Sequence, residues 1–130
     1  MSRAKNLANF QTTITDGTTS VATSFVTNGS AKAWAAVQTN TGSHVLAGSF
    51  NISSTVDLGT GYGTLNLSSS MSDVNYSAIS AKQNAFNNNA SQTFFYTGSS
   101  VSQVRFSFFE SGGTLVDPYH YVGTVHGDLA

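Results

Sequence analysis

Hydrophobic and polar residues alternate with a period of two along most of this chain. From Thr12 onward, short runs of valine, threonine, serine and aromatic residues are separated by turn dipeptides such as Asp16-Gly17, Asn28-Gly29 and Gly112-Gly113. A period of two places successive side chains on opposite faces of a β-strand, and the dipeptides favour turns between strands. The pattern therefore predicts about seven or eight short strands in an all-β fold, an antiparallel, jelly-roll-like β-sandwich.

Each expected strand is marked by residues that share one face. In chain order these residues are Val21, Thr23 and Phe25; Ala31, Ala33, Ala35 and Val37; Leu46, Gly48, Phe50 and Ile52; Leu65 and Leu67; Val74, Tyr76 and Ala78; Val104, Phe106 and Phe108; and Tyr119, Tyr121 and Val125. The segment from Ala81 to Ser91 contains three consecutive asparagines and is expected to be a surface loop.

The first residues differ in composition from the rest of the chain. Residues 1–10 contain two cations and several good helix formers but no glycine, and Leu7 and Phe10 would share one face of a short helix. A helix of this length is only marginally stable alone. We expect residues 1–13 to form a helical or extended attachment segment and residues 14–130 to form one β-sandwich domain; the alternative is a frayed terminus. The residues expected to make the attachment are Arg3, Lys5, Leu7 and Phe10.

Composition narrows the possible functions. Only 8% of the 130 residues are charged and the formal net charge is -1, while Ser, Thr, Asn and Gln account for 52 residues. Nucleic-acid binding is not expected without a basic surface, and no apolar run is long enough for membrane insertion or a secretory signal. The lack of cysteine excludes disulfides and thiolate metal ligands. So few charges are best tolerated in a subunit that packs among copies of itself.

Neither catalysis nor a cofactor is predicted from the histidines and serines. The chain lacks a Gly-x-Ser-x-Gly motif. His120 and His126 are on one strand face but about 20 Å apart, so they cannot bind one metal ion within a chain. Three copies of one histidine could do so only across a threefold axis. His44 precedes a strand and is expected to be a solvated turn residue.

The acidic residues favour turns over catalysis. Several of the five aspartates, among them Asp73 and Asp117, lie beside Gly, Pro or Ser, where a short acceptor side chain binds the backbone. The run from Asp57 to Gly63 is superficially similar to a glycine-rich phosphate loop. It lacks the lysine and the following helix of such a loop, so we expect a hairpin turn.

The chain contains three short motifs, Lys32-Ala33-Trp34, Ser49-Phe50-Asn51 and Gly59-Thr60-Gly61. They resemble a module of tail-fibre and related structural proteins of tailed bacteriophages, especially marine ones. The similarity continues through Leu65-Asn66-Leu67, Met71 to Tyr76, Gly113 to Asp117 and Val122 to Asp128. It covers the chain from about Asn28 to Asp128.

This resemblance implies a β-sandwich fibre tip that assembles as a homotrimer, attaches to other virion proteins and contacts a host cell-surface glycan or protein. The protein would be made in the host cytoplasm and carried on the tail or head surface of the virion. Long fibres carry a shaft ahead of the tip, whereas only Met1 to Thr13 precedes the expected sandwich. A short fibre is therefore expected, and a capsid decoration or head-spike protein with a purely structural role is the alternative.

The expected contact residues lie in loops and on one strand. For ligand binding they are Tyr62, Asn84, Asn87, Asn88 and Asn89, and for the trimer interface they are Ala31, Ala33 and Ala35. In this interpretation Trp34 fills the core while the alanines on the opposite face pack flat against a neighbouring copy. Alternatively, Trp34 is an exposed platform for sugar rings.

Overall fold

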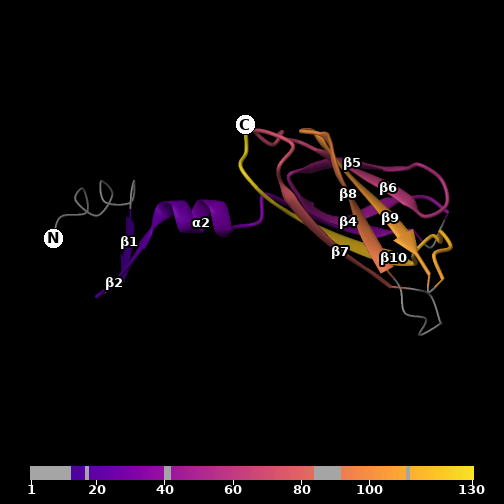
Figure 1. Cartoon of the computed structure of the whole chain (residues 1–130), viewed down its shortest axis with the longest axis horizontal. Coiled ribbons are helices and arrows are strands. Elements are labelled where there is room, and N and C mark those ends of the chain that lie inside the picture. The colour runs from indigo at the N-terminus through magenta and orange to yellow at the C-terminus, as the bar shows by residue number, and fades with distance from the viewer. Residues whose placement is uncertain (1–12, 17, 40–41, 84–91, 111) are drawn as a thin grey trace. The chain divides into compact units, whose positions relative to one another are not determined.

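The computed structural model describes residues 13–16, 18–39, 42–83, 92–110 and 112–130 (Figure 1). The chain divides into two compact units, Met1–Ser30 and Ala31–Ala130, and each is described here by itself. The boundary expected after residue 13 therefore lies after residue 30. The reason is that residues 13–29 form a hairpin and a helix instead of the first strand of the sandwich.

The first unit contains a β-hairpin followed by a short helix. Strand β1 (Thr13–Asp16) pairs antiparallel with β2 (Thr19–Ala22), and helix α2 (Thr23–Gly29) starts at the next residue. The hydroxyl of Ser30 donates a hydrogen bond to the carbonyl of Thr27, and its backbone N–H donates to the carbonyl of Val26. These bonds satisfy carbonyl groups that a helix end leaves unpaired.

The expected strand through Val21, Thr23 and Phe25 is wrong beyond its first residue. Only Val21 lies in a strand, while Thr23 and Phe25 belong to α2. A local hydrogen bond from the Thr27 hydroxyl to the carbonyl of Thr23 accompanies the helical turn. Residue propensity is a weak constraint on so short a segment. Phe25 is 76% exposed, so the described residues of the first unit do not bury its side chain.

The second unit is an antiparallel β-sandwich. Its strands are β3 (Ala33–Gln38), β4 (Val45–Phe50), β5 (Ile52–Asp57), β6 (Tyr62–Leu67), β7 (Ser77–Gln83), β8 (Gln92–Ser100), β9 (Gln103–Phe109) and β10 (His120–His126). The first sheet has the order β4-β3-β10-β7 and the second has the order β5-β6-β9-β8. The predicted all-β antiparallel sandwich is thus confirmed.

The hydrophobic core lies between the two sheets. Alternate residues of β3 and β9 point into it, as the period of two predicts, and the ring centroids of Phe108 and Tyr121 are 4.8 Å apart. Met71 and Tyr76, which lie between β6 and β7, also contribute to it. The buried apolar residues are Ala33, Ala35, Val37, Ile52, Leu65, Leu67, Met71, Tyr76, Val104, Phe106, Phe108, Tyr121 and Val125.

The chain changes sheets at Asn51. One continuous strand from Leu46 to Ile52 was expected, but β4 ends at Phe50 and β5 begins at Ile52 in the other sheet. Asn51 has a positive φ of 55°, a conformation that asparagine adopts more readily than most residues. Its amide donates to the carbonyls of Lys32 and Ser69, which stabilises the corner.

Strand β7 extends further than expected. Ala81 and Lys82 were assigned to a loop, but they pair with Val122 and Tyr121 of β10. A central neighbouring strand can hold polar residues in a sheet against their own preference for loops. Residues 84–91, the rest of the expected loop, lie outside the described residues.

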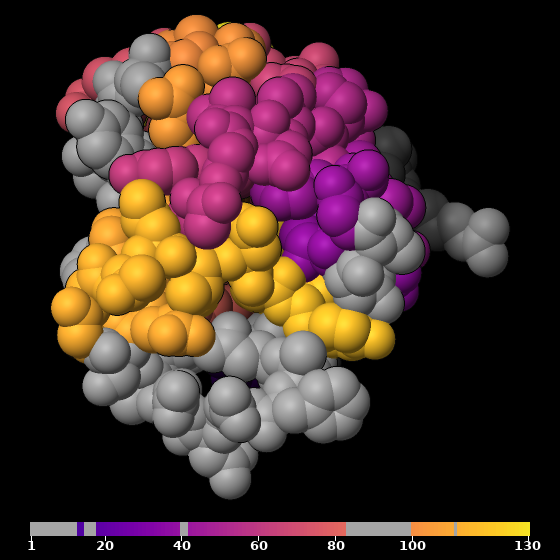
Figure 2. All heavy atoms as spheres, turned by 90° about the vertical axis from the view of Figure 1, so that its right-hand side faces the viewer, coloured from indigo at the N-terminus to yellow at the C-terminus, as the bar shows by residue number. Residues whose placement is uncertain are grey.

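The sandwich has two distinct ends. At the entry end, Ala31 precedes β3 and Gly127 follows β10; these strands pair antiparallel. At the opposite end, named the loop end, the hairpin of residues 58–61 meets residues 115–117 (Figure 2). Gly61 has a φ of +75°, and an added Cβ would lie 2.8 Å from Leu115 and 2.9 Å from the carbonyl of Phe108. Only glycine permits this close approach.

Candidate functional site

The structure describes one of the five residues expected to bind a ligand. Tyr62 is the first residue of β6, at the loop end, and is half-buried. The other four are Asn84, Asn87, Asn88 and Asn89, and they lie outside the described residues. Gln83 and Gln92, which flank that segment, are described: Gln83 pairs with His120 and Gln92 with Phe109, both at the loop end.

The expected attachment residues also fall outside the described part of the chain. These are Arg3, Lys5, Leu7 and Phe10. The attachment segment therefore stays a prediction. What the structure adds is the position at which the first unit joins the sandwich, since residue 31 lies at the entry end.

The expected trimer interface on the alanines of β3 is wrong. Ala33 and Ala35 are 0% and 1% exposed and belong to the core between the two sheets, while Ala31 lies before the strand and is partly buried. Trp34 has the opposite orientation from the one expected and is 44% exposed. Alternation showed that the alanines and the tryptophan lie on opposite faces, but it did not show which face is inside.

The outer face of the first sheet carries a broad apolar surface. The strand register aligns two neighbouring rows of outward residues across all four strands. One row contains large side chains: Phe50 is 54% exposed and Ile79 is 66% exposed. The other row consists mainly of small residues. Together the two rows are named the apolar face, and their members are Phe50, Trp34, Thr124 and Ile79 in the first row and Gly48, Ala36, Val122 and Ala81 in the second.

The sequence contains a signal for this face on strand β3. Strand β3 carries apolar residues on both sides, with Val37 inside and Trp34 and Ala36 outside. A strand with one solvated face is expected to alternate between apolar and polar residues. Apolar residues on both faces are typical of a strand that is covered on both sides.

The outer face of the second sheet is polar. The Gln103 amide donates to Asn66 Oδ1 over 2.9 Å, and the Asn66 amide donates to Ser54 Oγ over 2.8 Å. This amide ladder crosses strands β9, β6 and β5. Its members are exposed or half-buried, so the ladder satisfies polar groups at a surface that water reaches.

His44 lies in a buried polar cluster at the loop end. Its side chain is only 4% exposed, so the expectation of a solvated turn residue is wrong. Nδ1 lies 3.4 Å from the hydroxyl of Tyr121, and Nε2 lies 3.9 Å from Asp57 Oδ1. A Cβ on Gly63 would lie 2.9 Å from that hydroxyl and 3.1 Å from His44 Cε1. Glycine at this position therefore gives the two rings room to enter.

The Tyr121 hydroxyl joins the two sheets. It lies 3.1 Å from Thr55 Oγ1, and the Thr55 hydroxyl donates to the carbonyl of Thr64. Burial raises the pKa of Tyr121 to about 12, although the hydrogen bond to Thr55 acts in the opposite direction. Tyr121 is 1% exposed, so its hydroxyl is not presented to a solute. The cluster thus links the two sheets through buried side chains.

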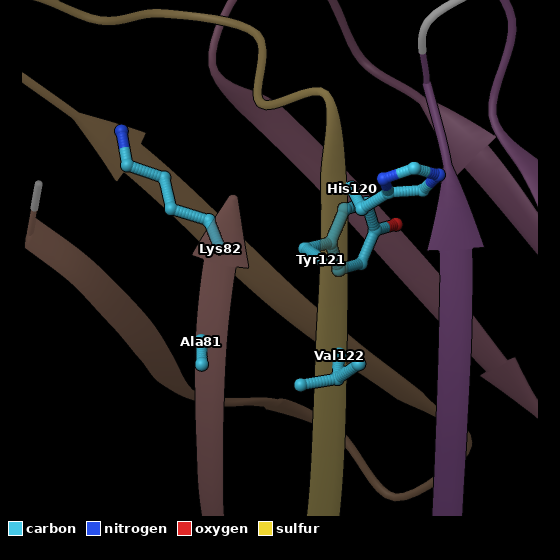
Figure 3. A pocket seen from close by; sticks show the side chains of 5 residues that line it. All are labelled: Ala81, Lys82, His120, Tyr121 and Val122. Atoms are coloured by element: carbon cyan, nitrogen blue, oxygen red, sulfur yellow. The ribbon is translucent and has the colours of Figure 1, made fainter. Parts of the chain in front are cut away.

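A small hollow opens between β7 and β10. Its volume is about 210 Å³, below the roughly 300 Å³ at which ligand pockets usually begin. The lining residues are Ala81, Lys82, His120, Tyr121 and Val122 (Figure 3). The Lys82 ammonium donates to the carbonyl of Phe109, and burial lowers its pKa while Glu110 acts in the opposite direction. The lysine is therefore engaged with the backbone.

Three aspartates bind backbone amides, as predicted from their neighbours. Asp57 Oδ1 accepts from the N–H of Gly59, and Asp117 Oδ1 accepts from the N–H of Gly61, both over 2.7 Å. Asp73 binds the N–H two residues later in the same way. Their carboxylates stabilise turns, and the predicted hairpin at residues 58–61 is confirmed.

Within the described ranges, no group of three or more His, Cys, Asp or Glu side chains could hold a metal ion. In the same part of the chain, no helix is long and apolar enough to cross a membrane. Comparison with protein-family models, curated proteins and solved structures found no match. Function is therefore inferred from the geometry of the chain and the motifs of its sequence.

Proposed function

We propose that this chain is a structural protein of a tailed-bacteriophage virion. It acts as a short fibre or fibre-tip module that is attached to the particle and contacts the host cell surface. The motif resemblance from about Asn28 to Asp128 and the β-sandwich fold support this role. The observation that carries the proposal is the separation of the two ends of the sandwich.

The end at which the chain enters is opposite the end at which the expected contact loops gather. Ala31 lies at the entry end, whereas the hairpin at 58–61 and the residues that flank 84–91 lie at the loop end. A module held through its N-terminal residues can therefore present the loop end to a cell. The length of the strands separates the point of attachment at residue 31 from the expected contact loops at the loop end.

Recognition at the loop end rests on neutral groups and on no catalytic step. The carboxylates of Asp57 and Asp117 are engaged with backbone amides. Asparagine amides offer both donors and acceptors to sugar hydroxyls, and Tyr62 adds flat aromatic surface. Each contact is worth on the order of 1 kcal/mol. Firm attachment comes from many weak sites acting together on one particle.

The test is adsorption of particles to host cells as a function of salt. We expect nearly constant binding between about 0.01 and 0.15 M ionic strength, because neutral contacts are not screened. Particles with Tyr62→Ala should adsorb less, and Val101→Ala, an exposed apolar residue near the entry end, is the matched control. A steep loss of adsorption with salt while the fold is intact would refute neutral recognition.

The N-terminal residues provide the attachment. Deletion of residues 1–10 removes both cations and the apolar pair Leu7 and Phe10 but leaves every strand in place. We expect the shortened chain to fold and to be absent from purified particles. Normal incorporation of the shortened chain would show that attachment lies elsewhere.

The assembly implied by the resemblance is a homotrimer. Three copies around one axis would also multiply the weak contacts at the loop end. Light scattering and native mass spectrometry of the full chain are expected to give the mass of three chains or of a multiple of three. A stable monomer at micromolar concentration would contradict this part of the proposal.

A second candidate is a capsid decoration or head-spike protein with a purely structural role. The observation in its favour is the apolar face, because a flat uncharged sheet surface suits contact with a neighbour in a shell. Antibody labelling or cryo-electron microscopy of particles separates the two candidates. Label at the tail supports the fibre, and label distributed over the head supports decoration.

A further inference from the structure

Within the second unit, no described segment covers the apolar face. Its four largest apolar side chains are fixed on a folded sheet and cannot turn into the core. Soluble monomers rarely expose contiguous apolar patches of more than a few hundred Å². The exposed fractions of these side chains are 44% for Trp34, 54% for Phe50, 66% for Ile79 and 49% for Val122.

The first sheet is large enough to form the centre of a specific interface. Four strands about 4.8 Å apart and about six residues long cover about 400 Å² in projection. Side chains that stand out from the sheet raise the accessible area to the order of 500 Å². Two such faces together would bury about 1,000 Å², which is near the lower bound for a specific protein interface.

The apolar face suits contact with another β-sheet. The row of Phe50, Trp34 and Ile79 carries the large side chains, and the Trp34 indole also extends over Gly48 in the adjacent row, where an added Cβ would lie 3.5 Å from the ring. Sheets that pack face to face bring such side chains together about 10 Å apart.

The lack of charged residues indicates which surface covers the apolar face. The described outward residues of the first sheet include no Asp, Glu, Lys or Arg, so a charged partner would gain nothing there. The outer face of the second sheet is polar, and its amide ladder is already hydrogen-bonded. The matching surface on a copy of this chain is therefore its own apolar face. Two uncharged faces also meet without repulsion.

We propose that the apolar face binds the apolar face of a second copy of this chain around a twofold axis. Such an isologous contact uses the same residues on both chains and joins chains in pairs. The assembly then contains an even number of chains. This inference rests on the geometry of the first sheet alone. A separate threefold contact on another surface of the chain, together with this twofold contact, would give an assembly of three pairs.

A matched pair of substitutions tests the inference. Val122→Lys places an ammonium group in the apolar face, whereas Val56→Lys makes the same change on the outer side of the second sheet. The two valines are 49% and 41% exposed, so both variants should fold. Native mass spectrometry of the full chain should show an even-numbered assembly. Val122→Lys should raise its dissociation constant at least about a hundredfold, because two ammonium groups would be buried in the contact, and Val56→Lys should leave it unchanged.

The single tryptophan of the chain reports on the same surface. Trp34 emission should shift to longer wavelength on dilution, over the concentration range in which the mass falls. Circular dichroism checks that both variants keep the native fold. A shift of emission that does not follow the mass would show that association buries another surface and would overturn the inference.

The result also separates this inference from the proposed function. A trimer that persists in Val122→Lys would support the threefold assembly and overturn the twofold contact. A monomer at all concentrations would overturn both, and would leave the face to another virion protein or a glycan. An even-numbered assembly that Val122→Lys alone disrupts would establish the twofold contact, whatever particle labelling shows.

Discussion

The outer faces of the two sheets differ although the sheets share strand number, antiparallel pairing and a common core. On the second sheet, Asn66 accepts from one neighbouring amide and donates to a serine. On the first sheet, Trp34 lies over Gly48, where an added Cβ would be 3.5 Å from the indole ring. The residues of the inner faces are determined by packing within the chain, whereas the residues of an outer face depend on the solvent or partner that contacts it. The unlike outer faces therefore carry information about partners that the core does not.

The largest expected effect contrasts an inner aromatic residue with an outer one. Phe106→Ala should lower the free energy of unfolding by about 3–5 kcal/mol, because it leaves a cavity in a core position that is 0% exposed. Phe50→Ala, at 54% exposure, should change it by about 0.5 kcal/mol or less in the monomer. Urea unfolding at concentrations too low for association measures both. Equal losses would mean that Phe50 belongs to the core of a single chain.

The next effect concerns the hydroxyl that joins the inner faces. Because burial raises the pKa of Tyr121 to about 12, unfolded chains lose this proton before folded chains do. The contribution of the protonated Tyr121 hydroxyl to the free energy of unfolding is complete below pH 10 and is lost as the pH rises towards 12. This loss is on the order of 2 kcal/mol. Tyr121→Phe should cost about 1 kcal/mol near neutral pH, where it removes the contact with Thr55. The variant should also lack this alkaline loss in urea titrations.

The amide ladder of the second sheet predicts a smaller loss. Asn66→Ala removes the partner of both Ser54 and Gln103, and it should lower the free energy of unfolding by about 1 kcal/mol. Gln38→Ala, an exposed amide on the outer side of the first sheet, should stay within about 0.5 kcal/mol. Thermal unfolding of the two variants side by side would show whether the polar face is more than solvated surface.

The smallest expected effect is a gain. Gly48 has no positive φ, and an added Cβ would make ordinary contacts of 3.5 Å and 3.6 Å with Trp34. Gly48→Ala should therefore stabilise the chain by about 0.5 kcal/mol, since alanine loses less backbone freedom on folding. A lower melting temperature for this variant would indicate that the Trp34 indole needs the space that glycine leaves beneath it.

Alternation in the sequence predicted the fold class and many of the residues that share a face. Val104, Phe106 and Phe108 were expected on one face, and all three are 0% exposed. The same reasoning failed for β3, because small alanines can fill a core position as well as a tryptophan can. A period of two identifies the residues that share a face, and the choice of the inner face depends on the opposing sheet.

The site features that escaped prediction depend on residues distant in the sequence. His44 is buried by Tyr121 from another strand and by the space that Gly63 leaves. The corner at Asn51 depends on carbonyls of Lys32 and Ser69. Turn chemistry, in contrast, is local, which is why the roles of Asp57 and Asp73, each bound to the N–H two residues later, could be predicted from their neighbours. The partner of Asp117 is the N–H of the distant Gly61.

The position of β3 has a mechanical consequence. This strand runs from the entry end to the loop end between β4 and β10, and hydrogen-bonds to both. A pull between residue 31 and the loop end acts along the strand and loads both ladders of hydrogen bonds in shear, all at once. A pull between Ala31 and Ala130 acts at one end only and peels β3 from β10 bond by bond. The sandwich therefore resists tension along its strands far better than tension across its termini, which is the property that the proposed tether between a particle and a cell would need.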